Sequence, residues 1–265
     1  MTVQLFPHDH LDHLIREAAR RDPRITHALA YGSFTQGAAD RFSDLEYFLY
    51  LPDPARLDVP AWVGGVLRDS PFRIRHFFVN DFGTPNFVLD GLLRLELHAE
   101  TPDRLADLAG WPAAHADPTR MSVKDTDGRL AGALRRLGTR AQPDPAAEAQ
   151  GILDRLLGWL VFGANVLARG ERIRAHELLA WVRGGLLRLA RLADGQTGHW
   201  VNPSRLAEWE LGSAALERYA RTTGPLDRLE IHYAEAWAWT TELAAALGLH
   251  VPPDLAHDLS RGLRR

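Results

Sequence analysis

The chain has 265 residues, of which 46% are hydrophobic and 25% charged, and its formal net charge at pH 7 is -3. This balance excludes the broad basic surface of a sequence-independent nucleic-acid binder, and the lack of cysteine excludes disulfides, thiolate metal sites and cysteine nucleophiles. No uninterrupted apolar run approaches the roughly 20 residues of a membrane span, and no basic region precedes an apolar stretch at the N-terminus, so we expect a cytoplasmic protein with no membrane partner.

The first half of the sequence predicts short helices and strands in alternation. The expected elements are a helix at 8–20, strands at 25–31 and 43–51, a helix at 61–68 and strands at 72–79, 86–90 and 92–98. Turn residues at 80–81 and 83–85 favour a hairpin between the strands at 72–79 and 86–90. This order indicates a mixed sheet with one or two helices on one face.

The second half of the sequence is almost wholly helical in pattern. The expected helices span 146–169, 173–194, 203–211 and 226–247, and the breaks between them fall at Gly170, Asp194-Gly195 and Gly224-Pro225. The change of pattern predicts two domains, 1–140 and 141–265, joined by a linker at 141–145. Six tryptophans lie in this half, and we expect most of them in a core or interface and a minority in the wall of a pocket: Trp159, Trp181, Trp200, Trp209, Trp237 and Trp239.

The first strands carry a glycine-serine pair followed by two spaced acids. Strand 25–31 runs into Gly32-Ser33, where backbone amides and a hydroxyl can approach phosphate oxygens. In the next strand, alternation places Asp44 and Glu46 on one face and apolar residues on the other. Two such carboxylates suit one or two magnesium ions, which bind through a few carboxylates and the phosphates of a substrate. The combination therefore predicts a site for a metal-bound nucleoside triphosphate.

A third carboxylate is expected nearby, because transfer to an alcohol needs a group that accepts the hydroxyl proton. Alternation in strand 92–98 places Glu96 on the face opposite its leucines, within reach of the first two acids if the strands share a sheet. Asp90 and Glu100 are alternatives, each nearer a strand end. Without the upstream motif, Glu96 would be interpreted as a solvated residue paired with Arg94 or His98.

Two further features are open to more than one interpretation. Arg169, at the end of a long predicted helix, either binds triphosphate oxygens or is a helix C-terminal charge that favours the dipole. The run of His and Asp at residues 8–13 resembles a metal cluster, but beside Pro7 it is more typical of a helix start, and no closing ligand is identifiable.

The glycine-serine pair with the two acids is the signature of the polymerase-beta-like nucleotidyltransferase superfamily, and the chain resembles one branch of it, the lincosamide nucleotidyltransferases of the larger, dimeric type. The resemblance extends in order over most of the chain. It is carried by Tyr31-Gly32-Ser33-Phe34-Thr35, Ser43-Asp44-Leu45-Glu46, the strand with Glu96, Asn165-Val166-Leu167, Arg169-Gly170-Glu171, Glu177-Leu178-Leu179 and Thr222-Thr223.

This resemblance implies a fold, a reaction and partners. The fold is α+β, with an N-terminal nucleotidyltransferase domain followed by an all-α bundle that binds the acceptor and forms a homodimer. Asp44 and Glu46 would bind two magnesium ions, Glu96 would be the base, and Gly32, Ser33 and Arg169 would hold ATP or another nucleoside triphosphate. The reaction implied is AMP transfer to a hydroxyl of an antibiotic acceptor such as lincomycin or clindamycin. The surface is richer in Arg and Ala than in the resistance enzymes, so the acceptor can differ.

Three other functions remain open at this point. An aminoglycoside nucleotidyltransferase would need an acidic acceptor pocket, and the helical half has no dense acidic run. A protein-modifying nucleotidyltransferase would label a protein hydroxyl. A nucleotide-binding regulator without turnover would not need a base, so the three carboxylates argue against it. Residues of the helical half that could contact an acceptor include Trp159, Trp181 and His232.

Overall fold

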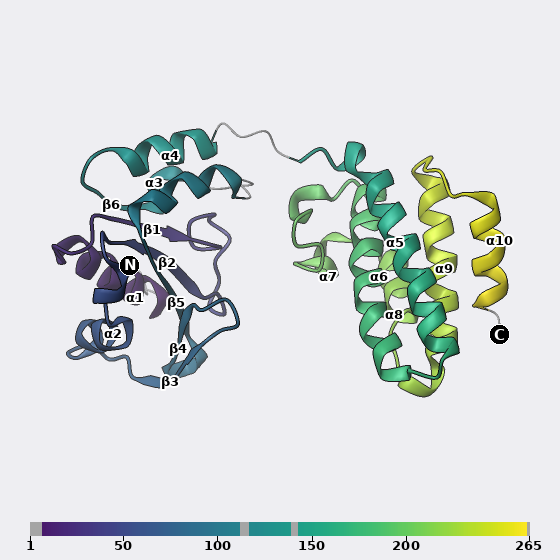
Figure 1. Cartoon of the computed structure of the whole chain (residues 1–265), viewed down its shortest axis with the longest axis horizontal. Coiled ribbons are helices and arrows are strands. Elements are labelled where there is room, and N and C mark those ends of the chain that lie inside the picture. Colours follow the sequence, from purple (N-terminus) through teal and green to yellow (C-terminus); the bar gives the residue numbers. More distant parts are fainter. Residues whose placement is uncertain (1–6, 112–116, 139–142, 264–265) are drawn as a thin grey trace, which may run out of the picture. The chain divides into compact units, whose positions relative to one another are not determined.

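The computed structural model describes residues 7–111, 117–138 and 143–263. The chain divides into two compact units, Met1–Gln142 and Pro143–Arg265, and each is described by itself (Figure 1). The expected domain boundary between residues 140 and 141 lies outside the described residues. The first unit contains a mixed sheet with helices and the second is helical, which confirms the predicted α+β fold.

The first unit contains six strands, four α-helices and three 3-10 helices among its described residues. In chain order they are α1 (Pro7–Arg21), β1 (His27–Tyr31), β2 (Leu45–Tyr50), η1 (Pro54–Arg56), α2 (Val59–Leu67), β3 (Ile74–Val79), β4 (Pro85–Leu89), η2 (Asp90–Leu92), β5 (Arg94–Glu100), η3 (Pro102–Gly110), α3 (Pro118–Met121), β6 (Ser122–Asp125) and α4 (Arg129–Gly138). The elements from η3 to α4 were not predicted. Each is short, and β6 is only four residues long, too short for an alternating pattern to identify.

The strand order in the sheet is β3-β4-β5-β2-β1-β6. β2 and β5 pair in parallel, whereas the other neighbours are antiparallel. The hairpin between β3 and β4 is the one that the turn residues predicted. This order places the strand after the glycine-serine pair next to the strand with Glu96, near the middle of the sheet.

Helices pack on both faces of the sheet, not on one as expected. On one face, α1 and α2 bury the apolar side of the central strands, including Leu45, Tyr47 and Leu97. On the other face, η3 and α4 pack against Leu29, in the middle of β1, and Tyr50, at the end of β2 that lies away from the acids. The acids occupy the remaining part of this second face, because Glu46 and Tyr50 point to the same side of β2.

The second unit is a helical bundle. Its elements are α5 (Pro145–Ala168), α6 (Arg172–Ala193), η4 (Thr197–His199), α7 (Ala207–Glu210), α8 (Ser213–Arg221), η5 (Leu226–Arg228), α9 (Leu229–Ala246) and α10 (Pro253–Gly262). The helix expected at 203–211 is wrong: only its last part is helical, and Leu206 has a left-handed φ of 52°, which starts a new helix rather than continuing one. α8 and α10 were not predicted.

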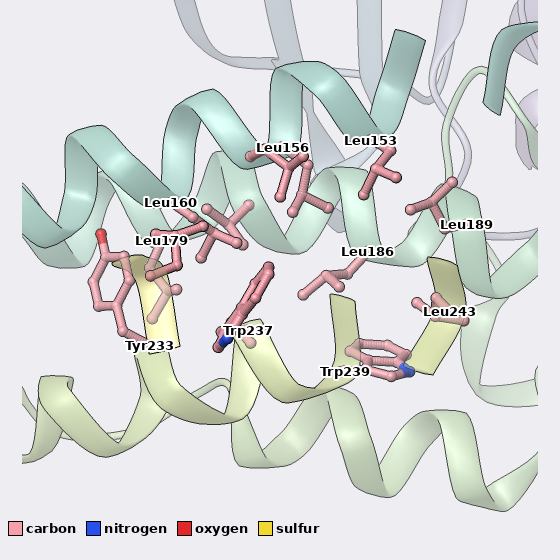
Figure 2. Close-up of a cluster of buried hydrophobic side chains, with 14 of the residues drawn as sticks. Leu153, Leu156, Leu160, Leu179, Leu186, Leu189, Tyr233, Trp237, Trp239 and Leu243 are labelled. Atoms are coloured by element: carbon pink, nitrogen blue, oxygen red, sulfur yellow. The ribbon is translucent and has the colours of Figure 1, made fainter. Parts of the chain in front are cut away.

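The core of this unit lies where α5, α6 and α9 meet. Figure 2 shows Leu153 and Leu160 facing Leu179, Leu186 and the rings of α9. By length and composition α5 is apolar enough to cross a membrane, but its buried leucines pack in this core. Three of the six tryptophans are buried as predicted, namely Trp200, Trp237 and Trp239. Trp181 and Trp209 are exposed over 63% and 79% of their surface, and Trp181 lines a cleft, the position expected for a minority of the tryptophans.

Candidate active site

The glycine-serine pair forms the turn directly after β1. Gly32 has a φ of +79°, a left-handed conformation that favours glycine, and the amide and hydroxyl of Thr35 both donate to its carbonyl, at 3.1 and 2.9 Å. A Cβ at Gly32 would overlap the carboxylate of Glu46. The absence of a side chain therefore lets the turn lie directly against this acid.

The acids lie together because of the strand register. β1 pairs Tyr31 with Glu46, and β2 pairs Glu46 with Glu96. The residues beside them in β2 and β5, Leu45 and Leu95, point to the buried face. The predicted alternation is therefore present in both strands, and it places Glu46 and Glu96 side by side on the opposite face.

Asp44 differs slightly from the expectation, since it precedes β2 rather than lying within it. One of its carboxylate oxygens, Oδ2, lies 3.4 Å from Nη1 of Arg94, at the start of β5. Both side chains are partly exposed, so the pair is weak. Arg94 thus partly offsets the charge of the acids without occupying a buried position.

Glu96 has a defined partner within its own strand. Its Oε1 accepts a hydrogen bond from Nε2 of His98 at 2.9 Å, the pairing that the simpler interpretation of Glu96 also expected. The His98 ring lies parallel to Phe48, with centroids 3.9 Å apart. Burial lowers the pKa of His98, so the imidazole is neutral at pH 7 and donates Nε2–H to the carboxylate. The contact fixes the orientation of Glu96.

The electrostatics of the group centre on Glu46. Its pKa is raised to about 7, first by burial and then by the charges of Asp44 and Glu96, while Arg94 lowers it. A carboxylate in this position is costly to ionise unless a cation is close. A hard divalent ion prefers carboxylate oxygens as ligands, and its charge would favour the ionised form of these acids. The residues therefore fit magnesium.

The alternative acids and Arg169 each lie at the end of a strand or helix or in a turn. Asp90 belongs to the η2 turn, where its Oδ2 accepts from the amide of Arg73 at 2.8 Å, so it has the structural role of a turn residue. Glu100 is the last residue of β5. Arg169 is the C-cap of α5 in the helical unit, where its amide bonds to the last carbonyls of that helix.

Two features involving histidine were missed or only partly anticipated. His8 is buried in α1, and its Nε2 lies 2.7 Å from the carbonyl oxygen of Ser43, directly before the acidic pair. Its ring therefore connects α1 to the segment that leads into β2, which is a structural role and not a metal-binding one.

The other feature is a group of His27, Asp125 and Asp127, whose ligand atoms lie within 4.8 Å of one another. Among the described residues it is the only such group, so the three acids of the predicted site are not gathered as closely. The carboxylates of this group accept from amides at the start of α4 and, in Asp127, from Nε2 of His27 at 2.8 Å. The polar atoms thus already have partners in the protein. His27 is about 100 positions from the two aspartates in sequence, so no local motif could identify the group.

Comparison with known proteins gives one matching family model and several similar solved structures. No curated protein matches the sequence. The chain is similar to an aminoglycoside 6-adenyltransferase from Bacillus subtilis, with a TM-score of 0.40 and 12% identity over 96% of this chain and 95% of that one. It is also similar to a nucleotidyltransferase-like protein from Exiguobacterium sibiricum 255-15, with a TM-score of 0.39 and 15% identity over 91% and 76% of the two chains. At these scores neither similarity carries a conclusion about activity.

The family match is confined to the helical unit. Residues 146–263 match the model of the lincosamide nucleotidyltransferase-like C-terminal domain. The match covers α5 to α10, the part of the chain in which the resemblance distinguished this branch of the superfamily. The helical part of this chain therefore matches the C-terminal domain of lincosamide nucleotidyltransferase-like proteins, as the sequence resemblance predicted.

Proposed function

We propose that this protein is a nucleotidyltransferase that moves a nucleoside monophosphate, AMP from ATP, to a hydroxyl group of a small molecule and releases pyrophosphate. The observation that supports this most is the register of β1, β2 and β5, which aligns Glu46 with Glu96 beside the turn at Gly32. The match of the helical unit to a nucleotidyltransferase-associated family model supports the same reaction class.

In this proposal Asp44 and Glu46 hold two magnesium ions. Magnesium supplies positive charge against the phosphates and the departing pyrophosphate. The raised pKa of Glu46 supports the assignment, because a nearby cation would stabilise the ionised form that the site needs at pH 7. Asp44, directly before β2, contributes the second carboxylate.

Glu96 acts as the general base. His98 donates to Oε1, and the hydroxyl proton of the acceptor passes to the carboxylate through Oε2. The stacking of His98 on Phe48 and its contact of 3.4 Å with the Thr84 hydroxyl limit rotation of the imidazole. A base oriented in this way needs no rearrangement when the acceptor arrives.

The triphosphate binds at the turn after β1. A turn with a positive φ at Gly32 exposes backbone amides to phosphate oxygens, and the Ser33 hydroxyl lies beside them. Arg169 of the helical unit is proposed as a further phosphate ligand on the basis of the family resemblance. Its guanidinium could bind two phosphate oxygens at once.

The first acceptor to test is a lincosamide, since the family model that the helical unit matches carries that name. An aminoglycoside, another hydroxylated small molecule and a protein hydroxyl are the alternatives. A homodimer formed through the helical unit and a cytoplasmic location belong to the same proposal.

The test is pyrophosphate release by the purified protein with MgATP and lincomycin, clindamycin or kanamycin, with mass spectrometry of each antibiotic. We expect a lincosamide that gains one AMP. Glu96→Gln should lower turnover by about 10² to 10⁴, the usual contribution of a general base, and Asp44→Asn should lower it further. Glu100→Gln, on the same strand, is the matched control and should retain activity.

Two results would count against the proposal. Full turnover of Glu96→Gln would remove Glu96 from the mechanism. Metal-dependent turnover in Asp44→Asn at the wild-type rate would refute the assignment of the metal site. If ATP binds and no antibiotic is modified, labelling of a lysate with tagged ATP would separate a protein acceptor from a protein without turnover.

A further inference from the structure

The helical unit contains a cleft of about 690 Å³ that the proposed reaction does not explain. Its walls come from α5, α6 and α8 and from the segment after η4. The volume lies within the range of about 300 to 1,000 Å³ that is typical of small-molecule sites. All of its lining residues belong to the second unit, so the cleft is complete within that unit.

The charged side chains that line this cleft are all positive. Arg155, Arg183 and Arg188 line it, and no Asp or Glu is among its described lining residues. None of the three forms an ion pair within the described part of the chain: Arg183 and Arg188 donate only to backbone carbonyls, each at 3.3 Å. Elsewhere in the same unit Arg172 and Arg191 pair with glutamates. Three arginines without carboxylate partners around one cleft favour an anion.

A pair of stacked tryptophans forms the apolar wall of the cleft. The rings of Trp159 and Trp181 lie 5.4 Å apart with 28° between their planes. Trp181 is 63% exposed, and Leu156 and Leu187 are among the other residues that line the cleft. An exposed tryptophan that is stacked on another ring presents a flat apolar surface, which suits a flat ring in a ligand.

A glycine inside α6 supports the same interpretation. Gly184 lines the cleft, and a Cβ built on it would meet no atom within 4 Å. Packing therefore does not require glycine here, although glycine weakens a helix interior relative to alanine. The neighbouring Gly185 differs, because its Cβ would lie 3.0 Å from Leu156 of the facing helix. Gly184 instead leaves room in the cleft wall.

We propose that this cleft binds a small ligand that combines a flat aromatic or apolar ring with a carboxylate or phosphate group. The ring lies against the tryptophan pair, and the anionic group accepts hydrogen bonds from the three guanidinium groups. The same charges disfavour a polycation such as an aminoglycoside in this cleft. The proposal does not depend on the transfer reaction, since ligand binding here needs neither ATP nor magnesium.

Calorimetric titration without ATP and magnesium tests the proposal with three ligands that share one ring system. The probes are 1-naphthoate, 1-naphthyl phosphate and the neutral 1-naphthamide, and the first two distinguish a carboxylate from a phosphate ligand. At least one anion should bind about tenfold or more tightly than the amide. Arg155→Gln and Arg183→Gln should each weaken the better anion about tenfold, whereas Arg261→Gln, at an exposed position of α10 outside the cleft, should not change it.

Glycine variants separate binding from folding. Gly184→Ala should raise the melting temperature and weaken the anion, because the methyl group favours the helix and fills part of the cleft. Gly158→Ala is the matched control: it lies in α5 with open space around its Cβ and outside the cleft. It should raise the melting temperature without changing affinity.

Four results would overturn the proposal. These are the absence of binding by both anions, equal affinity for the amide, wild-type affinity in both arginine variants, and Gly184→Ala binding as tightly as wild type. A fifth result would assign the cleft to a second copy of the chain. It is a change in tryptophan emission when the protein is diluted without ligand. Trp181→Phe would abolish this change, whereas Trp209→Phe, at an exposed ring outside the cleft, would retain it.

Discussion

The raised pKa of Glu46 makes a prediction about stability that can be tested without knowledge of any substrate. The pKa of this acid is about 7 in the folded protein and 4.5 in its usual environment. The folded state therefore holds the proton more tightly than the unfolded state. In the metal-free protein, the free energy of unfolding falls as the pH rises from about 4.5 to about 7. Above about pH 7, Glu46 causes no further loss of stability. Glu46→Gln removes the charge and should abolish this loss.

The size of the effect follows from the pKa difference. Each pKa unit corresponds to about 1.4 kcal/mol, so the full difference sets an upper limit of about 3 kcal/mol. Because the carboxylate is only partly buried and water screens it, we expect Glu46→Gln to stabilise the metal-free protein by about 1 to 2 kcal/mol at pH 8. At pH 4.5 the variant and the wild type should be equally stable. Magnesium should stabilise the wild type at pH 8 and the variant much less.

The assay is urea unfolding in EDTA at pH 4.5 and pH 8, followed by hydrogen exchange of peptides from β2 and β5. These peptides report on the first unit alone, so unfolding of the helical unit does not contribute. Glu100→Gln, on β5 beyond the acids, is the matched control and should not reproduce the gain. A variant that is less stable than wild type at pH 8, or equally stabilised at both pH values, would refute the electrostatic reasoning.

Three further substitutions test the packing. Gly32→Ala should cost about 1 to 3 kcal/mol in urea unfolding and more than Gly83→Ala, because both glycines have positive φ but only at Gly32 does a Cβ overlap another side chain. Gly163→Ala should cost about 1 to 3 kcal/mol, since its Cβ would overlap the ring of Tyr233; no loss in melting temperature would show that the ring can move aside. Arg191→Met should cost about 3 to 5 kcal/mol, because the buried guanidinium pairs with Glu210 at 2.6 Å and donates to three backbone carbonyls, all of which would lose this donor. Denaturant unfolding of the bundle measures the loss, and removing the glutamate as well should recover part of it.

The arrangement of the acids could be predicted because it depends on strand alternation, a local property. Around Glu46 and Glu96, buried leucines alternate with half-buried acids, and this pattern is visible in a few consecutive positions of β2 and β5. That Glu46 and Glu96 are direct neighbours is not local. It depends on β5 pairing in parallel with β2, and the pattern alone could not distinguish this order from one in which β5 lies at an edge.

The elements that were missed are those whose stability comes from distant partners. β6 is held by β1 and by the contact of His27 with Asp127, which are 100 residues apart. α10 is a short helix whose buried Leu259 joins the core of the bundle. Such segments have weak patterns of their own, because their folding energy comes from tertiary contacts rather than from local propensity.

The exposed ring of Trp181 shows that residue type alone does not determine burial where a residue lines a binding cleft. Tryptophan is usually a core residue, but the sequence left a minority of the tryptophans to a pocket wall and named Trp181 as a possible acceptor contact. In the structure this ring lies 63% exposed beside three arginines without carboxylate partners and a glycine that packing does not require. Each of these departs from what stability alone would favour. Departures from a stable arrangement that cluster in one cleft are expected where a ligand, not the fold, determines the residues. The acids of the sheet show the same property, since Glu46 is costly to ionise until a cation approaches.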